Sequence, residues 1–137
     1  MGCDDLRVAL AFMQDSELQT VTDEDLVEEF QITSVCAGLV VMDPGSNTIR
    51  LFHYTSQVYL RRLRDSWLQH SEFHIASTCL KYLGSDTYVA VSDEFSRQVD
   101  CRMQEASSCY PFAVYATRKW GIYVMGLQSD PRIVSLV

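Results

Sequence analysis

The stretch from Val35 to Leu60, VCAGLVVMDPGSNTIRLFHYTSQVYL, holds the clearest structural signals in this chain of 137 residues. Residues 39–42 are apolar, residues 43–47 are turn formers, and residues 48–52 alternate between polar and apolar side chains. The proline in the turn fixes its φ, and the glycine or the asparagine can adopt the positive φ that a short hairpin loop needs. The pattern therefore predicts a β-hairpin from Leu39 to Phe52.

Helical patterns flank the predicted hairpin. The apolar spacing changes to a helical period over 54–63, and another helix is predicted over 4–12. Thr22 is a good N-cap for a helix leading into the hairpin, with Asp25 in the capping-box position, and Gly38 can end that helix in a left-handed conformation. A helix, a two-stranded wing and a following helix are the parts of a winged-helix domain.

After Asp65 the pattern is helical throughout. We predict one helix from Ser71 to Gly84, one that Ser92 caps, and one that Pro111 opens and Gly121 ends. The predicted buried residues of these helices recur at helical spacing: Phe73, Ala76, Leu80 and Leu83; Phe95, Val99 and Met103; Phe112, Tyr115, Ala116 and Trp120. The predicted fold is mainly α (α+β), a winged-helix-like domain in residues 1–65 followed by a helical linker or small bundle in 66–137.

Four blocks follow one another along the chain: CAGLV (36–40), IRLFHYTSQ (49–57) with YL (59–60), IASTCLKYL (75–83), and YPF (110–112) leading to WG (120–121). The first two resemble the winged-helix domain of fungal NACHT–ankyrin proteins, a type called the GPI inositol-deacylase winged helix. The last two resemble the helical stretch that follows it in those proteins. A complete domain of this type has another helix before Asp4. The resemblance therefore implies that residues 1–65 are N-terminally incomplete, or that the chain is a piece of a longer protein.

The resemblance implies a regulatory role within a NACHT-type (STAND) signalling receptor. The winged helix of such receptors folds as a lid against the nucleotide-binding domain, so the implied partners are neighbouring NACHT and ankyrin-type domains. An incomplete domain would leave an apolar face of Val8, Phe12, Phe30 and Leu39 uncovered, which predicts self-association. The alternative is a degenerate gene fragment of such a receptor with no retained activity.

His53 is the one candidate binding residue. In the related receptors, a histidine at this corner donates a hydrogen bond to the β-phosphate of ADP, within the pattern Phe-x-His-x-Ser/Thr-x-Gln-Glu-aromatic. Here Phe52 directly precedes His53, Thr55 and Gln57 match, and Val58 replaces the acidic residue. Imidazole suits this role because it donates a hydrogen bond when neutral and adds charge when protonated. The alternative is a structural histidine that caps the following helix.

Net charge argues against a nucleic-acid partner. The chain carries a formal charge of −7, and the stretch 23–36, which would supply a recognition helix, has five acidic residues and no Lys or Arg. No apolar run approaches the roughly 20 residues of a membrane span, and no secretion leader is seen at the start, so we expect a cytoplasmic protein. Five scattered cysteines indicate buried thiols, with Cys36 and Cys79 in the core.

No catalytic or metal-binding constellation is present in the sequence. The glycines never form Gly-x4-Gly-Lys-Ser/Thr, since Leu127 stands where Gly121 and Gly126 would need lysine, and there is no Gly-x-Ser-x-Gly elbow. His70 and His74 have the spacing of two zinc ligands but lack a third, which favours a structural His74 and a solvated His70. We therefore expect a non-enzymatic protein without a cofactor or metal. The basic cluster Arg61, Arg62 and Arg64 is either a solvated face or a docking patch.

Overall fold

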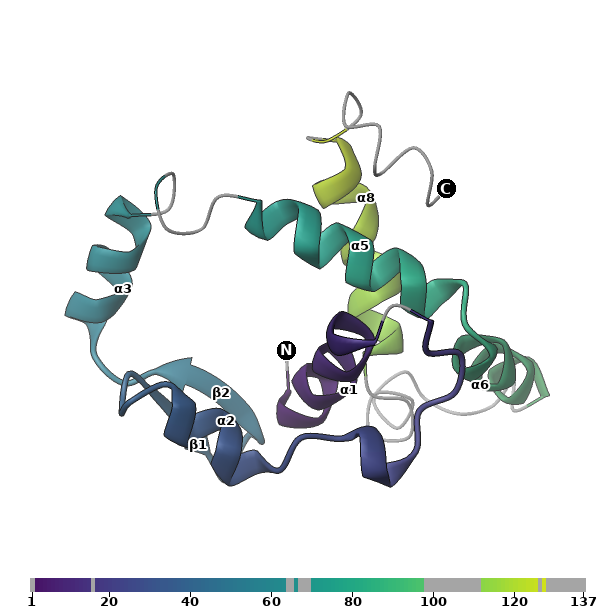
Figure 1. Ribbon diagram of the computed structural model, residues 1–137, viewed down its shortest axis with the longest axis horizontal. Coiled ribbons are helices and arrows are strands. Elements are labelled where there is room, and N and C mark those ends of the chain that lie inside the picture. The colour runs from purple at the N-terminus through teal and green to yellow at the C-terminus, as the bar shows by residue number, and fades with distance from the viewer. Residues whose placement is uncertain are drawn as a thin grey trace.

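The protein is mainly helical with one two-stranded sheet, in a winged-helix-like arrangement (Figure 1). The computed structural model describes residues 2–15, 17–63, 66, 70–97, 112–125 and 127. Its elements in chain order are α1 (Cys3–Gln14), the 3₁₀ turn η1 (Asp23–Asp25), α2 (Glu29–Val35), β1 (Val40–Asp43), β2 (Thr48–Leu51), α3 (Tyr54–Arg62), α5 (Ser71–Leu83), α6 (Asp86–Arg97) and α8 (Ala113–Met125).

The predicted hairpin is confirmed. β1 and β2 pair antiparallel, with Val40 opposite Leu51 and Asp43 opposite Thr48. In the turn the Asp43 carboxylate accepts a hydrogen bond of 3.1 Å from the Gly45 amide, which satisfies a donor that the tight loop leaves unpaired. Asn47 supplies the positive φ, at 48°.

The predicted helix leading into the hairpin is wrong in its first half. Thr22 and Asp25 do pair, because the Thr22 amide and hydroxyl both donate to the Asp25 carboxylate at 2.8 Å. However, that pair closes only the turn η1, and the backbone at Leu26 and Glu28 is extended. The Arg7 side chain of α1 donates a hydrogen bond of 2.8 Å to the Val27 carbonyl. In a continuous helix this carbonyl would instead accept a backbone amide four residues further on.

Two helices after Asp65 have other boundaries than those predicted. α6 begins six residues before Ser92, because the Ser85 hydroxyl accepts the Tyr88 amide at 3.3 Å and caps the helix there. The Ser92 hydroxyl instead donates to the Val89 carbonyl inside α6. Gly121 does not end α8, which continues to Met125. A single internal glycine costs a helix only about 1 kcal/mol, too little to stop it.

The remaining predictions for these helices have mixed outcomes. α5 ends at Leu83 as predicted, but its fully buried residues are Ala76, Cys79 and Tyr82, while Phe73, Leu80 and Leu83 are half-buried. On α8, Ala116 is buried and Trp120 is 37% exposed. Predictions for Val99, Met103 and Pro111 fall outside the described residues, as does the side chain of Phe95.

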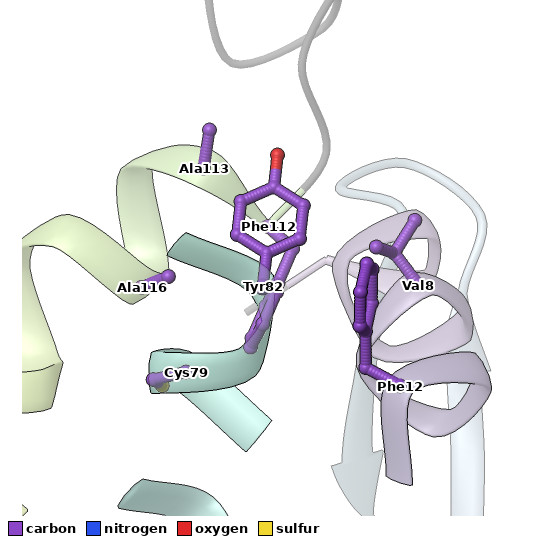
Figure 2. Close-up of a cluster of buried hydrophobic side chains, with 7 residues drawn as sticks. All are labelled: Val8, Phe12, Cys79, Tyr82, Phe112, Ala113 and Ala116. Atoms are coloured by element: carbon purple, nitrogen blue, oxygen red, sulfur yellow. The ribbon is translucent and has the colours of Figure 1, made fainter. Parts of the chain in front are cut away.

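The core lies where α1, α5 and α8 meet (Figure 2). The Tyr82 ring packs edge-on against Phe12 with centroids 5.4 Å apart, and against Phe112 at 5.2 Å. Cys79 and Ala116 are fully buried between α5 and α8, and such small side chains let two helices approach closely. The core therefore joins helices from both sides of residue 65, and the proposed division into residues 1–65 and 66–137 stays a prediction.

The start of α1 connects this core to the hairpin. The Cys3 amide donates to the Asn47 carbonyl at 2.7 Å, and the Asn47 side-chain amide donates to Asp4 at 2.8 Å. The Asp5 carboxylate accepts one hydrogen bond of 2.7 Å from the Gly2 amide and another from the Phe112 amide. These contacts fix the hairpin turn, the beginning of α1 and the beginning of α8 relative to one another.

Two phenylalanines test where the core lies. Phe12 is fully buried and Phe30 on α2 is 67% exposed. We expect Phe12→Ala to lower the free energy of unfolding by about 3–5 kcal/mol, since it removes a ring and leaves a cavity. The matched Phe30→Ala change should stay within about 0.5 kcal/mol. Chemical denaturation followed by circular dichroism measures both, and equal losses would place the core elsewhere.

Alkaline pH should unfold the protein through its buried acids. Burial raises the pKa of the Cys79 thiol from 9.0 to about 11 and that of the Tyr82 hydroxyl to about 12. The unfolded chain releases these protons at lower pH than the folded one, so stability is complete below pH 9 and falls between pH 9 and about 11. Denaturation at several pH values should show a shallower fall for Cys79→Ala than for the unmodified chain, and parallel curves would contradict this.

Candidate functional site

The part of the chain from α2 to α3 has almost no core of its own. Among residues 29–62, which the structure describes without a gap, Ile32 is the one buried side chain. The four aliphatic residues on one face of the hairpin are only half-buried: Val40, Met42, Ile49 and Leu51. α3 has no buried side chain at all. We call residues 29–62 the arm (left side of Figure 1).

The arm exposes a contiguous apolar surface at the base of the hairpin. Leu39 and Phe52 lie directly opposite one another beyond the last strand pair, and the Phe52 amide donates to the Leu39 carbonyl at 2.9 Å. Opposite residues of an antiparallel pair project to the same face. The Phe52 ring contacts the His53 ring with centroids 4.3 Å apart, and Tyr54 follows. Leu39 is 48% exposed, Phe52 58% and Tyr54 74%, and His53 is also exposed. We call these four residues the hairpin-base cluster.

His53 occupies the N-cap position of α3. Its carbonyl accepts hydrogen bonds from the Ser56 and Gln57 amides at 3.1 and 3.3 Å, while its side chain makes no capping bond. The backbone of His53 thus begins the helix, and its imidazole stays exposed beside Phe52. Such a ring is accessible to a group on another domain. A role for it in binding phosphate stays a prediction.

The other predicted histidines do not form a site in the described part of the chain. His70 precedes α5 as its N-cap, with a φ of 67°, and is exposed. The prediction of a structural His74 is wrong, because this side chain is also exposed, on the outer surface of α5 beside the Phe73 ring. No group of three or more potential metal ligands occurs among the described residues.

The cysteine predictions are partly confirmed. Cys79 is fully buried as expected, whereas Cys36 is only half-buried at the end of α2. Cys3 is fully buried too, and burial is the largest cause of the raised pKa of its thiol, ahead of the nearby Glu29 and Asp4 carboxylates. Cys101 and Cys109 fall outside the described residues.

Two packing predictions for the arm need correction. The predicted uncovered face is half wrong, because Val8 and Phe12 are buried in the core with α5 and α8, whereas Phe30 and Leu39 are exposed. The sequence also suggested that the apolar side of the hairpin packs on Val35, Tyr59 and the first helix, but Val35 is 80% exposed and Tyr59 58% exposed. The downstream helices therefore complete the core around α1 and leave the arm uncovered.

Sequence reasoning missed the hairpin-base cluster as a surface. The alternation of residues 48–52 places Phe52 on the face of Thr48 and Arg50, opposite to the apolar face of Ile49 and Leu51, but an aromatic side chain at the end of a strand suggested burial. A possible signal was the position of Leu39 and Phe52 at the open ends of two short strands, next to the polar His53.

Comparison with known proteins adds no relative: no protein-family model, no curated protein and no solved structure matches this chain. Within the part of the chain that the structure describes, none of the helices combines the length and the apolar character needed to cross a lipid bilayer.

The hairpin-base cluster should bind a hydrophobic dye. The double variant Leu39→Ser, Phe52→Ser removes two contiguous exposed apolar side chains and should lower the fluorescence of a bound naphthalene sulfonate dye. The control variant Ile122→Ser, Met125→Ser alters two side chains of α8 that are 61% and 74% exposed and should have the smaller effect. Equal effects in the two variants would show that the cluster is not a distinct apolar surface.

Proposed function

We propose that this chain is a non-catalytic regulatory and interaction module of a NACHT-type (STAND) signalling receptor, working in the cytoplasm as an interdomain lid. The observation that carries the proposal is the arm, because 34 consecutive residues bury one side chain and expose a contiguous apolar cluster. Exposed apolar surface of this kind marks a place where another protein surface binds. The four sequence blocks that resemble fungal NACHT–ankyrin proteins support the identity of the parent receptor.

In this proposal the hairpin-base cluster packs against the neighbouring nucleotide-binding domain. Leu39, Phe52 and Tyr54 supply apolar contact area, which stabilises the closed arrangement by about 25 cal/mol for each Å² removed from water. The exposed imidazole of His53 donates a hydrogen bond to a phosphate of the bound nucleotide. The apolar contacts hold the lid, and the histidine makes its closure depend on the nucleotide.

The second candidate is a degenerate fragment of a receptor gene without retained activity. Val58 favours it, because this residue replaces the acidic side chain that follows the glutamine in the related pattern. The flanking genomic sequence separates the two. An open reading frame that encodes Gly-x4-Gly-Lys-Ser/Thr upstream and ankyrin-like repeats downstream supports the module, whereas stop codons support the fragment.

Nucleotide binding tests the role of His53. The chain alone should show no measurable ADP binding by calorimetry, because one hydrogen bond cannot hold a nucleotide without a glycine-rich phosphate loop. In a receptor rebuilt with its nucleotide-binding domain, His53→Ala should weaken ADP binding by about 1.5–3 kcal/mol, the value of a hydrogen bond to a charged group. That loss corresponds to about a ten- to hundredfold higher Kd.

The matched control is His74→Ala, which removes another exposed imidazole on α5 and should leave the ADP affinity of the rebuilt receptor unchanged. An unchanged affinity for His53→Ala as well would assign His53 a structural role. Strong ADP binding by the isolated chain would also contradict the proposal, which expects no measurable binding without the nucleotide-binding domain.

A further inference from the structure

Opposite charges are separated along this chain. Residues 15–29 contain seven acidic side chains and no Lys or Arg, which gives a formal charge of −7. Residues 39–62 contain Arg50, Arg61 and Arg62 against the single acid Asp43, a formal charge of 3 − 1 = +2. The hairpin and α3 thus form a basic region on an acidic protein, and α8 carries a second basic pair, Arg118 and Lys119.

The arginines of the basic region are exposed. Helical spacing places Tyr54, Val58 and Arg61 on one face of α3, and no side chain of this helix is buried. Arg50, Arg61 and Arg62 are exposed, and no carboxylate forms a salt bridge with any of them within the described part of the chain. The face therefore combines exposed aromatic surface with cations that form no salt bridge to any of the described residues.

The acidic region is exposed as well. The side chains of Asp23, Glu24 and Glu28 all face solvent, and Phe30, two residues further on, is 67% exposed. In Figure 1 the turn η1 of this acidic segment, residues 23–30, lies on the other side of the hairpin from α3. Its charge and its exposed aromatic ring match the cations and the tyrosines of α3.

We propose that a second copy of this chain occupies the basic face of α3. The acidic segment of each copy would pack against α3 of the other, in an antiparallel pair with two-fold symmetry. Charge complementarity favours this occupant, because one chain carries both halves of the contact and a two-fold axis forms each contact twice. The dimer requires neither the proposed receptor nor the role of His53, and Tyr54 belongs to both proposed contact surfaces.

Charge reversal tests the dimer by sedimentation equilibrium of the full chain. The variant Arg61→Glu, Arg62→Glu and the variant Glu24→Lys, Glu28→Lys should each raise the dimer dissociation constant by about tenfold or more, because each places like charges opposite one another. An equimolar mixture of the two should regain association, since every altered surface then faces a surface of opposite charge. Raising the ionic strength from about 0.05 M to about 0.5 M should weaken the unmodified dimer.

The control variant Arg118→Glu, Lys119→Glu changes the net charge from −7 to −11, as Arg61→Glu, Arg62→Glu does, at exposed positions of α8. It should keep the dissociation constant of the unmodified chain. Circular dichroism verifies that all variants fold, as exposed substitutions should allow. A monomer at every concentration and salt level would overturn the proposal, as would a dimer that survives both reversals or a mixture that stays monomeric. If the protein is a monomer at every concentration and salt level, the partner of α3 is not a second copy of this chain.

Discussion

The edge-on contacts that the Tyr82 ring makes with Phe12 and Phe112 hold together three helices that are distant in sequence. Each ring comes from a different part of the chain, so this cluster provides the long-range contact that no local pattern supplies. Phe112 adopts a φ of 70°, a left-handed conformation that costs a residue with a side chain about 1–2 kcal/mol. Burial of its ring and the bond from its amide to Asp5 compensate for that cost.

The aromatic core also explains how α1 is stabilised. Val8 and Phe12 would have lain uncovered in a separate N-terminal domain, but they pack in the same cluster as Cys79 and Tyr82 of α5 and Ala116 of α8. The hydrophobic surface of α1 is thereby buried, whereas the apolar surface of the arm stays exposed. Because of this unequal burial, most of the exposed apolar surface of the two regions lies on the hairpin and α3.

The features that sequence predicted well are governed by local chemistry. The turn residues around Gly45 determine the hairpin, and its register follows from the turn. Features decided by tertiary contacts were not predictable: Arg7 binds the Val27 carbonyl and shortens α2, and the Phe12 and Phe112 rings select the buried side of α5. The position of His53 at the start of α3 followed from the pattern, whereas the exposure of its neighbour Phe52 depended on which surfaces the core left free.

The hydrogen bonds at the start of α1 have a consequence for how the protein responds to a load. Asn47 in the hairpin turn is bonded to Cys3 and Asp4, and the adjacent Asp5 is bonded to Phe112 in the aromatic core. The arm is therefore joined to the helices at its turn as well as through the chain that follows α3. A force or a binding free energy applied at the hairpin is therefore transmitted to the residues around Tyr82. The protection of their backbone amides from hydrogen exchange then reports binding at the hairpin, although these residues lie in the core.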